Sequence, residues 1–255
     1  MYYNYVYFCK IKNYLENLEI NRWEKKKGNI ENLANNIQRL RLCITKDLNS
    51  GTEKDMITAV VISIMDKTGE RVGNNESASN GHYGITGLKK KHISVNGNTI
   101  TLKYIAKSGV EQEKKFTDEN IAKVLKKILN NNTENVFVTS EGFKISNDRV
   151  NRYLSTFDVT AKDIRGYSAN KWIIKKLEQK ELFKEEKDRK KVFNETLKSV
   201  AEKIGHGKAT LKKHYLIPEL ETNYIEESKI INLSNKDSYE AGGAIKNFNY
   251  EIGGL

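Results

Sequence analysis

Apolar residues recur at steps of three and four in the first quarter of the chain, which is the spacing of one helix face. The first such stretch has its apolar face at Leu33, Ile37, Leu40, Ile44 and Leu48. The second, EKDMITAVVISIMDK at 53–67, is apolar on nearly every side in its middle, and Thr52 with Asp55 gives it a capping-box-like start. The pattern predicts an amphipathic helix packed against a second helix at the centre of the core.

The pattern changes to strands between 92 and 116. HISV at 92–95, TITLKYIAK at 99–107 and VEQEKKF at 110–116 are separated by the turn sequences NGN and SG. Asn96 followed by Gly97 favours a type I′ hairpin turn, because both central residues of that turn need a positive φ. We therefore expect a small antiparallel three-stranded sheet.

Helical patterns return after the sheet. Helices are predicted around 117–129, 147–155, 167–180 and 188–204. Gly205 stands in the position that usually ends a helix, and Pro218, the only proline, is expected to end the short segment that carries Tyr215. The predicted fold class is α+β, mostly helical with a small antiparallel three-stranded sheet.

Three regions of the chain differ in pattern. Residues 1–21 are aromatic and weakly patterned, and we interpret them as an N-terminal remnant or linker. Residues 22–220 carry the predicted helices and strands and form the expected folded domain. Residues 221–255 are rich in Asn, Ser and Gly and show little periodicity, so we expect a C-terminal tail of unknown role.

The charge of the chain narrows the choice of partners. Among 255 residues, 44 Lys and Arg oppose 33 Asp and Glu, which gives a formal net charge of +11. This balance favours a polyanionic partner, with nucleic acid as the leading candidate. The alternative is a metabolic enzyme that is basic only because its proteome is rich in lysine.

The cysteines and the lengths of the apolar stretches indicate the cellular compartment in which the protein works. Cys9 and Cys43 lie far apart and form no CxxC pair, so neither a zinc ribbon nor a disulfide framework is indicated. The sequence has no run of about 18 apolar residues and no secretory signal pattern at its start. We expect a cytoplasmic protein, in a bacterial cytosol or a virus-infected cell, that works where the DNA lies and has no membrane partner.

Several motifs of nucleotide and metal chemistry are missing from the sequence, namely GxxxxGK[ST], GxGxxG after a strand, HExxH and the EF-hand loop. A reaction on nucleic acid would then need side chains to supply a nucleophile, positive charge for the phosphate oxygens and a proton for the leaving oxygen. Residues of the required types are Arg71, Lys107, Arg165, His206 and Tyr215. Each of them alone is more often a surface or core residue, so the residue types leave a purely structural interpretation open.

The sequence motifs around these residues are more specific than the residue types alone. The motifs are RVGN at 71–74, YGITGLKKKHI at 83–93, YIAKSGV at 104–110, KDIRGYSAN at 162–170 and VAEKIGHGKATLKKHYL at 200–216. In these motifs the chain resembles the catalytic domain of the type IB DNA topoisomerases, in particular the small poxvirus-like and bacterial branch. The resemblance covers residues 22–220.

This resemblance implies a reaction and a role for each residue. Tyr215 would attack a DNA phosphodiester and hold the 3′ phosphate covalently, while Lys107 would give a proton to the departing 5′ oxygen. Arg71, Arg165 and His206 would stabilise the transition state. Resealing by the 5′ hydroxyl after the free end has swivelled would relax supercoiled DNA, and neither ATP, a metal nor another cofactor is expected.

The resemblance also implies contacts to double-stranded DNA outside the reacting group. The residues expected to make them are Lys162, Tyr83, Lys89, Lys90, Lys91, Lys208 and Lys212. We expect a monomer. Such topoisomerases carry an N-terminal, largely β domain that closes over DNA, and the chain in front of residue 22 is too short to contain it, so a separate chain is one possible source of that clamp.

Two alternatives share these features. Tyrosine recombinases use the same plan, but their second arginine usually lies in His-x-x-Arg, whereas here Lys162 takes the histidine's place before Arg165. This favours the topoisomerase interpretation. A truncated DNA-binding module with weak or no turnover is the second alternative. Of the two histidines near Tyr215, we prefer His206 to His214, because GHG leads a turn ahead of the tyrosine.

Overall fold

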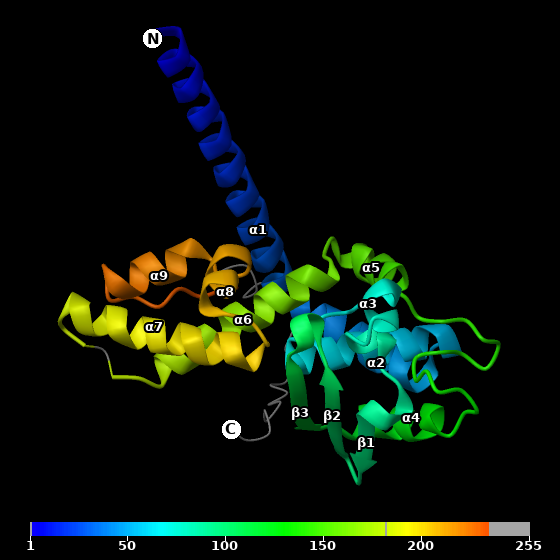
Figure 1. Cartoon of the computed structure of the whole chain (residues 1–255). Helices are drawn as coiled ribbons and strands as arrows, with labels where there is room; N and C mark the ends of the chain where they lie inside the picture. The colour runs from blue at the N-terminus through cyan, green and yellow to red at the C-terminus, as the bar shows by residue number, and fades with distance from the viewer. Residues whose placement is uncertain (1, 182, 235–255) are drawn as a thin grey trace.

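The structure, a computed structural model, describes residues 2–181 and 183–234, without the side chains of 2–19, 22 and 75. Within this part of the chain it is mostly helical and contains one three-stranded antiparallel sheet (Figure 1). The predicted α+β fold class is confirmed.

Helix α1 extends from Tyr2 to Ser50, and its N-terminal part projects beyond the rest of the molecule (Figure 1). It therefore includes nearly all of the region 1–21 that the sequence analysis interprets as a remnant or linker. The physical reason is that this stretch contains no proline and that the first glycine, Gly28, is a single one, so no residue is present that would stop the helix.

Helix α2, Glu53–Thr68, forms the centre of the larger core, as predicted. The side chain of Thr52 caps its start by accepting a hydrogen bond from the backbone N–H of Asp55. The apolar face of α1 packs against it, and an ion pair of 2.8 Å between Arg41 and Asp66 joins the two helices at their rim. Hydrophobic burial on both sides explains why the middle of α2 is apolar all round.

The sheet contains β1, Ile93–Asn96, β2, Thr99–Ile105, and β3, Glu111–Thr117, in that order. Ile100 of β2 lies opposite Val95 and Phe116, so one face of the sheet turns toward the core. Helix α4, Glu119–Leu129, packs against this sheet and against α2. The smaller helices of this half are α3, Asn75–Ser79, and α5, Asn147–Leu154.

Helix α6, Ala161–Glu178, joins two hydrophobic cores. Its first half, with Ile164, packs into the larger core, and its second half, with Ile173, packs into a smaller one. The helix begins well before the predicted residue 167, because Thr160 and Asp163 form a reciprocal capping box that starts it there. This correction places Arg165 in the first turns of α6.

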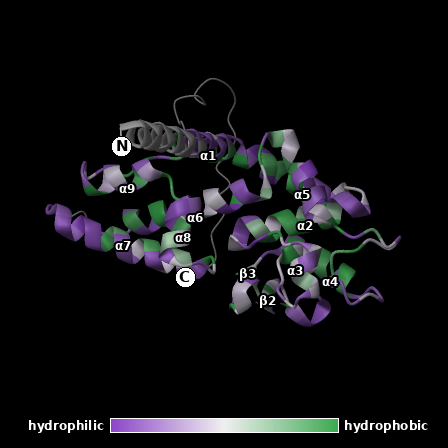
Figure 2. Ribbon diagram, turned by 45° about the horizontal axis from the view of Figure 1, so that its top comes forward, coloured by the Kyte–Doolittle hydropathy of each residue, from purple (hydrophilic) through white to green (hydrophobic). Residues whose placement is uncertain are grey.

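The smaller core is formed by α6 with α7, Glu186–Lys203, α8, Lys208–His214, and α9, Pro218–Ile225. Helices α7, α8 and α9 lie together on one side of the molecule, and the end of α7 contacts the sheet through Lys114 of β3 (Figure 1). Figure 2 shows that the N-terminal end of α7 is mostly hydrophilic. At this end the helix reaches the edge of the smaller core.

Pro218 does not end the segment of Tyr215 as predicted; it begins α9 at the first helical position. Proline is favoured there because its missing N–H would have no partner within the helix. Residues beyond 220 continue the fold, since Tyr224 and Leu233 are buried. Of the predicted tail, residues 235–255 lie outside the described part of the chain, and the division into domains stays a prediction.

Candidate active site

Arg71 is held where two glycine-containing segments meet. Helix α2 ends at Gly69, whose φ of 66° is left-handed, and an added Cβ there would lie 2.8 Å from the ring of Trp172. The backbone carbonyl of Arg71 then accepts a hydrogen bond from Ile85 at 2.9 Å. Gly84 lies so close to this segment that a Cβ added to it would be 2.4 Å from the Cα of Gly73. The motifs RVGN and YGIT therefore form one tight backbone pairing that fixes Arg71.

Lys107 lies at the tip of the hairpin between β2 and β3, as predicted. The turn is closed by hydrogen bonds between Ala106 and Val110 and between Gly109 and Ala106, of 2.8 Å and 3.1 Å. Ser108 and Gly109 both have positive φ, at 67° and 72°. The side chain of Lys107 is exposed, and a hydrogen bond of 2.8 Å from Tyr83 to the carbonyl of Ile105 ties the hairpin to the segment after α3.

Arg165 is 3% exposed, which is unusual for an arginine. Its Nη2 donates to the carbonyl of Ile204 at the end of α7. Its Nε and Nη1 are buried and have no hydrogen-bond partner among the described residues. Burial, together with the nearby charge of Arg71, lowers the pKa of Arg165. A buried guanidinium with two unpaired nitrogens is suited to binding an anion.

His206 follows the end of α7, where Gly205 has a φ of 65° and the N–H of His206 bonds to Ala201 at 2.8 Å. This Schellman-type end sets the direction in which His206 leaves the helix. Nη2 of Arg71 lies 3.2 Å from Nδ1 and 3.1 Å from Nε2 of its ring. Burial, with the charges of Arg165 and Arg71, lowers the pKa of His206 to about 3. The ring is therefore neutral near pH 7 and keeps an N–H to donate.

Tyr215 ends α8, and its backbone is anchored to α6 by Asn170. The side chain of Asn170 donates to the carbonyl of Tyr215 at 2.7 Å and accepts from the N–H of Ile217 at 2.9 Å. The Tyr215 ring lies 5.3 Å from the ring of His206, and the guanidinium carbon of Arg165 lies 5.6 Å from its centre. The tyrosine is thus next to two of the other predicted residues.

Helix α1 supports the same segment. Nζ of Lys26 donates to the carbonyl of Leu216 at 2.7 Å, and Lys27 pairs with Glu219 at 2.7 Å. Burial, with repulsion from Lys162, lowers the pKa of Lys26 to about 7. The sequence analysis identified neither Asn170 nor Lys26 as a site residue. Asn170 lies inside a quoted motif, but its role depends on contacts between distant segments and leaves no local signal.

Arg71, Lys107, Arg165 and Tyr215 line one pocket of about 480 Å³. The predicted DNA contacts Tyr83 and Lys162 lie on its wall, while its other lining residues are neutral or histidine, so no acidic side chain lines it. Such a pocket attracts a phosphate group, because its charges are all of one sign.

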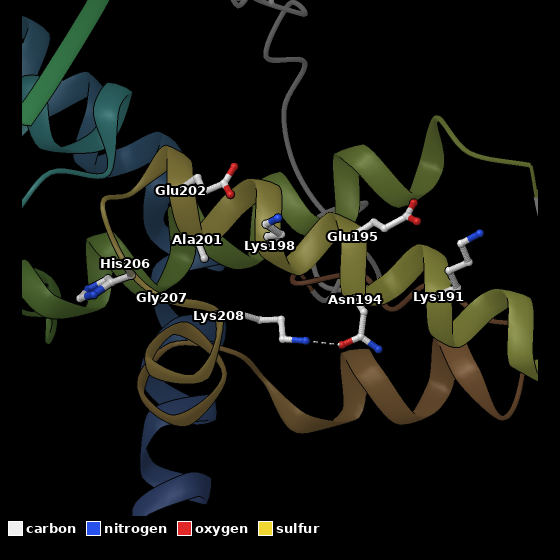
Figure 3. Close-up of a pocket in the computed structure, with 9 residues that line it drawn as sticks. All are labelled: Lys191, Asn194, Glu195, Lys198, Ala201, Glu202, His206, Gly207 and Lys208. Carbon is white, nitrogen blue, oxygen red and sulfur yellow. Dashed lines mark hydrogen bonds between the residues drawn. The ribbon is translucent and has the colours of Figure 1, made fainter.

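His206 reaches the site from the side of a neighbouring pocket of about 490 Å³ between α7 and α8 (Figure 3). In Figure 3 its ring lies at one end and points away from Lys191. Lysines there alternate with Glu195 and Glu202, so this second pocket has mixed charge. His214 lies at the end of α8 and does not line the pocket that contains Tyr215.

The remaining predicted DNA contacts lie away from that pocket and, where their partners are known, bond within the chain. Lys89 pairs with Glu134 at 3.0 Å, and Lys90 donates to the carbonyl of Asn131. Lys91 lies exposed beside them. The hydrogen bond from Lys208 to Asn194 is 3.1 Å long, and the ion pair of Lys212 with Glu221 is 2.8 Å long. Any contact of these lysines with DNA would therefore lie outside the reaction pocket.

No group of three or more His, Cys, Asp or Glu side chains in the described part of the chain is arranged to hold a metal ion. Among residues 2–181 and 183–234, no helix has both the length and the apolar character needed to cross a bilayer.

An α+β fold that gathers two arginines, a lysine and a tyrosine in one pocket, with a histidine beside them, has the arrangement expected of proteins that attack a phosphodiester with a tyrosine. The sequence comparison agrees with this class. The model of the family described as eukaryotic DNA topoisomerase I, catalytic core, matches residues 16–236, and the chain belongs to that family.

Individual relatives are distant. The chain is 27% identical over 199 residues to DNA topoisomerase 1B of Acanthamoeba polyphaga mimivirus, covering 71% of this chain and 59% of that protein. It is 22% identical over 224 residues to DNA topoisomerase 1B of Vaccinia virus, covering 86% of this chain and 70% of that protein. The match thus spans less than two thirds of the mimivirus protein.

Among solved structures, XerH site-specific recombinase bound to difH substrate matches with a TM-score of 0.46 and 16% identity, over 76% of this chain and 52% of that one. This similarity is too low to bear on the choice between a topoisomerase and a recombinase.

Proposed function

We propose that the protein is a type IB DNA topoisomerase that cuts and reseals one strand of double-stranded DNA through a 3′-phosphotyrosyl intermediate. In the forward step the phenolic oxygen of Tyr215 forms a bond to phosphorus and the bond from phosphorus to the 5′ oxygen breaks. Lys107 gives the leaving oxygen its proton, and the phenolic proton that Tyr215 releases to solvent balances it. The reverse step restores the original bond.

The observation that carries this proposal is the pocket of Arg71, Lys107, Arg165 and Tyr215, in which the buried Arg165 has two nitrogens without a hydrogen-bond partner among the described residues. The nonbridging oxygens of a phosphate gain negative charge in the transition state, and Arg71 with Arg165 would hold them. His206, neutral near pH 7, would act as a hydrogen-bond donor to the same oxygens.

Exchange of one phosphodiester for another conserves the energy of the linkage, so resealing needs no ATP. Between the two steps the free strand end swivels and supercoils relax. The protein would act as a monomer on one duplex, since the pocket contains all its reacting groups within one chain. The net charge of +11 favours association with DNA, and the protein would work in the compartment that holds it.

The test is relaxation of a supercoiled plasmid by the purified chain in EDTA without ATP, followed by capture of a covalent complex on a nicked duplex that cannot be resealed. We expect relaxation and a complex with the 3′ end of the cut strand. Tyr215→Phe should remove both while DNA binding persists. Tyr153→Phe is the matched control, because Tyr153 bonds to Asp47 at 2.6 Å in another part of the fold and does not line the pocket.

Four outcomes are informative. Equal capture by Tyr215→Phe would refute the assignment of the nucleophile. Capture at one preferred sequence, with strand exchange in place of relaxation, would favour the recombinase alternative. Binding without any capture would leave a DNA-binding module, and recovery of relaxation on addition of a second chain would show that the clamp is supplied separately.

A further inference from the structure

One acidic residue is buried next to Arg71, which lines the pocket shared with Lys107, Arg165 and Tyr215. Glu70 precedes Arg71 in the chain and is only 2% exposed. Its Oε2 accepts a hydrogen bond of 2.7 Å from the hydroxyl of Tyr104, and its Oε1 lies 3.2 Å from Nζ of Lys114. A buried carboxylate is costly unless it is paired, so this position calls for an explanation.

The partners of Glu70 connect it to the residues of the pocket. Lys114 on β3 also donates to the carbonyl of Lys203 at the end of α7. The next carbonyl, that of Ile204, accepts the hydrogen bond from Arg165. Lys114 and Arg165 therefore bind neighbouring carbonyls of the same helix end, and Lys114 in turn pairs with Glu70.

Electrostatic effects point the same way. The charge of Glu70 raises the pKa of Arg165 against the lowering by burial and by Arg71. Burial, followed by the charge and hydrogen bond of Glu70, raises the pKa of Tyr104, whereas Arg165 and Arg71 lower it. Glu70 thus interacts with Arg165 and directly precedes Arg71 in the chain, although it does not line the pocket.

Two neighbouring guanidinium groups repel each other, and removing one of them from water adds to the cost. A phosphate offsets this cost when it is bound. Before binding, an anion belonging to the protein must do so, and no acidic side chain lines the pocket.

We propose that Glu70 is the internal counter-ion of the phosphate site. It is a positioning residue that holds Arg71 and Arg165 together before DNA binds, through its charge and through Lys114 and Tyr104, and it lowers the affinity for the incoming phosphate. This inference rests on the proposed function in taking a DNA phosphate as the ligand.

The proposal predicts that loss of the Glu70 charge raises the affinity for anions, which a purely structural role would not predict. Glu70→Gln keeps the shape and the hydrogen bond from Tyr104 but removes the negative charge. The free protein should then unfold at a lower temperature, while the phosphate site should bind anions more tightly. Loss of a merely structural contact would lower stability and either weaken binding or leave it unchanged.

The experiment uses the full chain with Tyr215→Phe, so that binding to a DNA duplex is measured without cleavage. We expect Glu70→Gln to bind the duplex about fivefold to tenfold more tightly, as one removed charge at this range predicts for a partly solvated pocket. Inorganic phosphate should also raise the unfolding temperature of Glu70→Gln more than that of the parent.

Glu113→Gln is the matched control, because it makes the same change in net charge at an exposed position of β3, next to Lys114 in the chain. Glu113 pairs with Lys103 at 3.1 Å, and both side chains are more than half exposed, at 61% and 65%. Screening by salt should keep its effect on DNA affinity below about twofold. An equal tightening in both variants would mean a general charge effect and would overturn the proposal.

If Glu70→Gln does not fold, Lys114→Met tests the same proposal. Without the lysine, the charge of Glu70 acts on the arginines alone, so the affinity for the duplex should fall. The fall should be larger than in the control variant Lys103→Met. Unchanged or weaker binding in a folded Glu70→Gln would refute the counter-ion role, whatever the cleavage activity. Tighter binding by Glu70→Gln would support the counter-ion role even if the chain with Tyr215 intact never forms a covalent complex, a result that would refute the proposed function alone.

Discussion

Replacing Asn170 by alanine tests whether the tyrosine segment is held by α6. The Asn170 side chain is fully buried and bridges Tyr215 and Ile217 with hydrogen bonds of 2.7 Å and 2.9 Å. It also donates to Gly166 at 2.8 Å. Alanine would leave the carbonyl of Tyr215 and the N–H of Ile217 unpaired in the interior.

The expected magnitude follows from those groups. A buried polar group left without a partner costs about 1–3 kcal/mol, so the free energy of unfolding should fall by about 2–4 kcal/mol once some water enters. A displacement of the tyrosine by about 1 Å should slow formation of the covalent complex about a hundredfold, because the reaction depends on its alignment with the phosphate.

Urea denaturation gives the first quantity, and single-turnover cleavage with protein in excess over a duplex gives the second. Asn49→Ala is the control, since Asn49 is exposed and makes one local bond of 2.8 Å to Thr45, so its effect should stay within about 0.5 kcal/mol. If Asn170→Ala lowered stability as expected but cleaved at the parent rate, the positioning argument would be refuted.

Other predictions concern the remaining parts of the site. Lys107→Ala should slow cleavage of ordinary DNA by about 10²- to 10⁴-fold and spare a 5′-thio-linked duplex, whose leaving group needs no acid; equal slowing would exclude the general-acid role. Gly84→Ala should lower the free energy of unfolding by about 1–3 kcal/mol in urea, because the new Cβ would lie 2.4 Å from the Cα of Gly73, whereas Gly28→Ala, with no atom within 4 Å, should not destabilise. The pKa of His206 is lowered from 6.5 to about 3 by burial and by Arg165, so only the unfolded chain takes up this proton between these values, and stability falls as pH decreases through that window. His206→Gln should therefore lose less stability than the parent between about pH 7 and about pH 5, and an equal loss would contradict a buried neutral ring.

Sequence patterns predicted those helices and strands whose signals lie within a few neighbouring residues. The strands and the hairpin tip at Lys107 follow from alternation and turn residues, and α2 follows from its cap at Thr52. The periodicity predicts a start of α6 near residue 167, which is too late, although Thr160 and Asp163 carry a capping-box signal for the true start. Pro218 by its chemistry suits the beginning of a helix as well as the end of one, and only the helix that follows distinguishes the two.

The sequence by itself determined the fold class and predicted a set of reactive residues, since periodicity and motif wording are local properties of the chain. Only the tertiary structure decided which residues meet. It brought Asn170 to the backbone of Tyr215 and Glu70 behind Arg71, and it directed Lys89 toward Glu134 outside the pocket. The physical reason is that these contacts join segments distant in sequence, whose packing depends on two cores joined along α6 and not on any one stretch of residues.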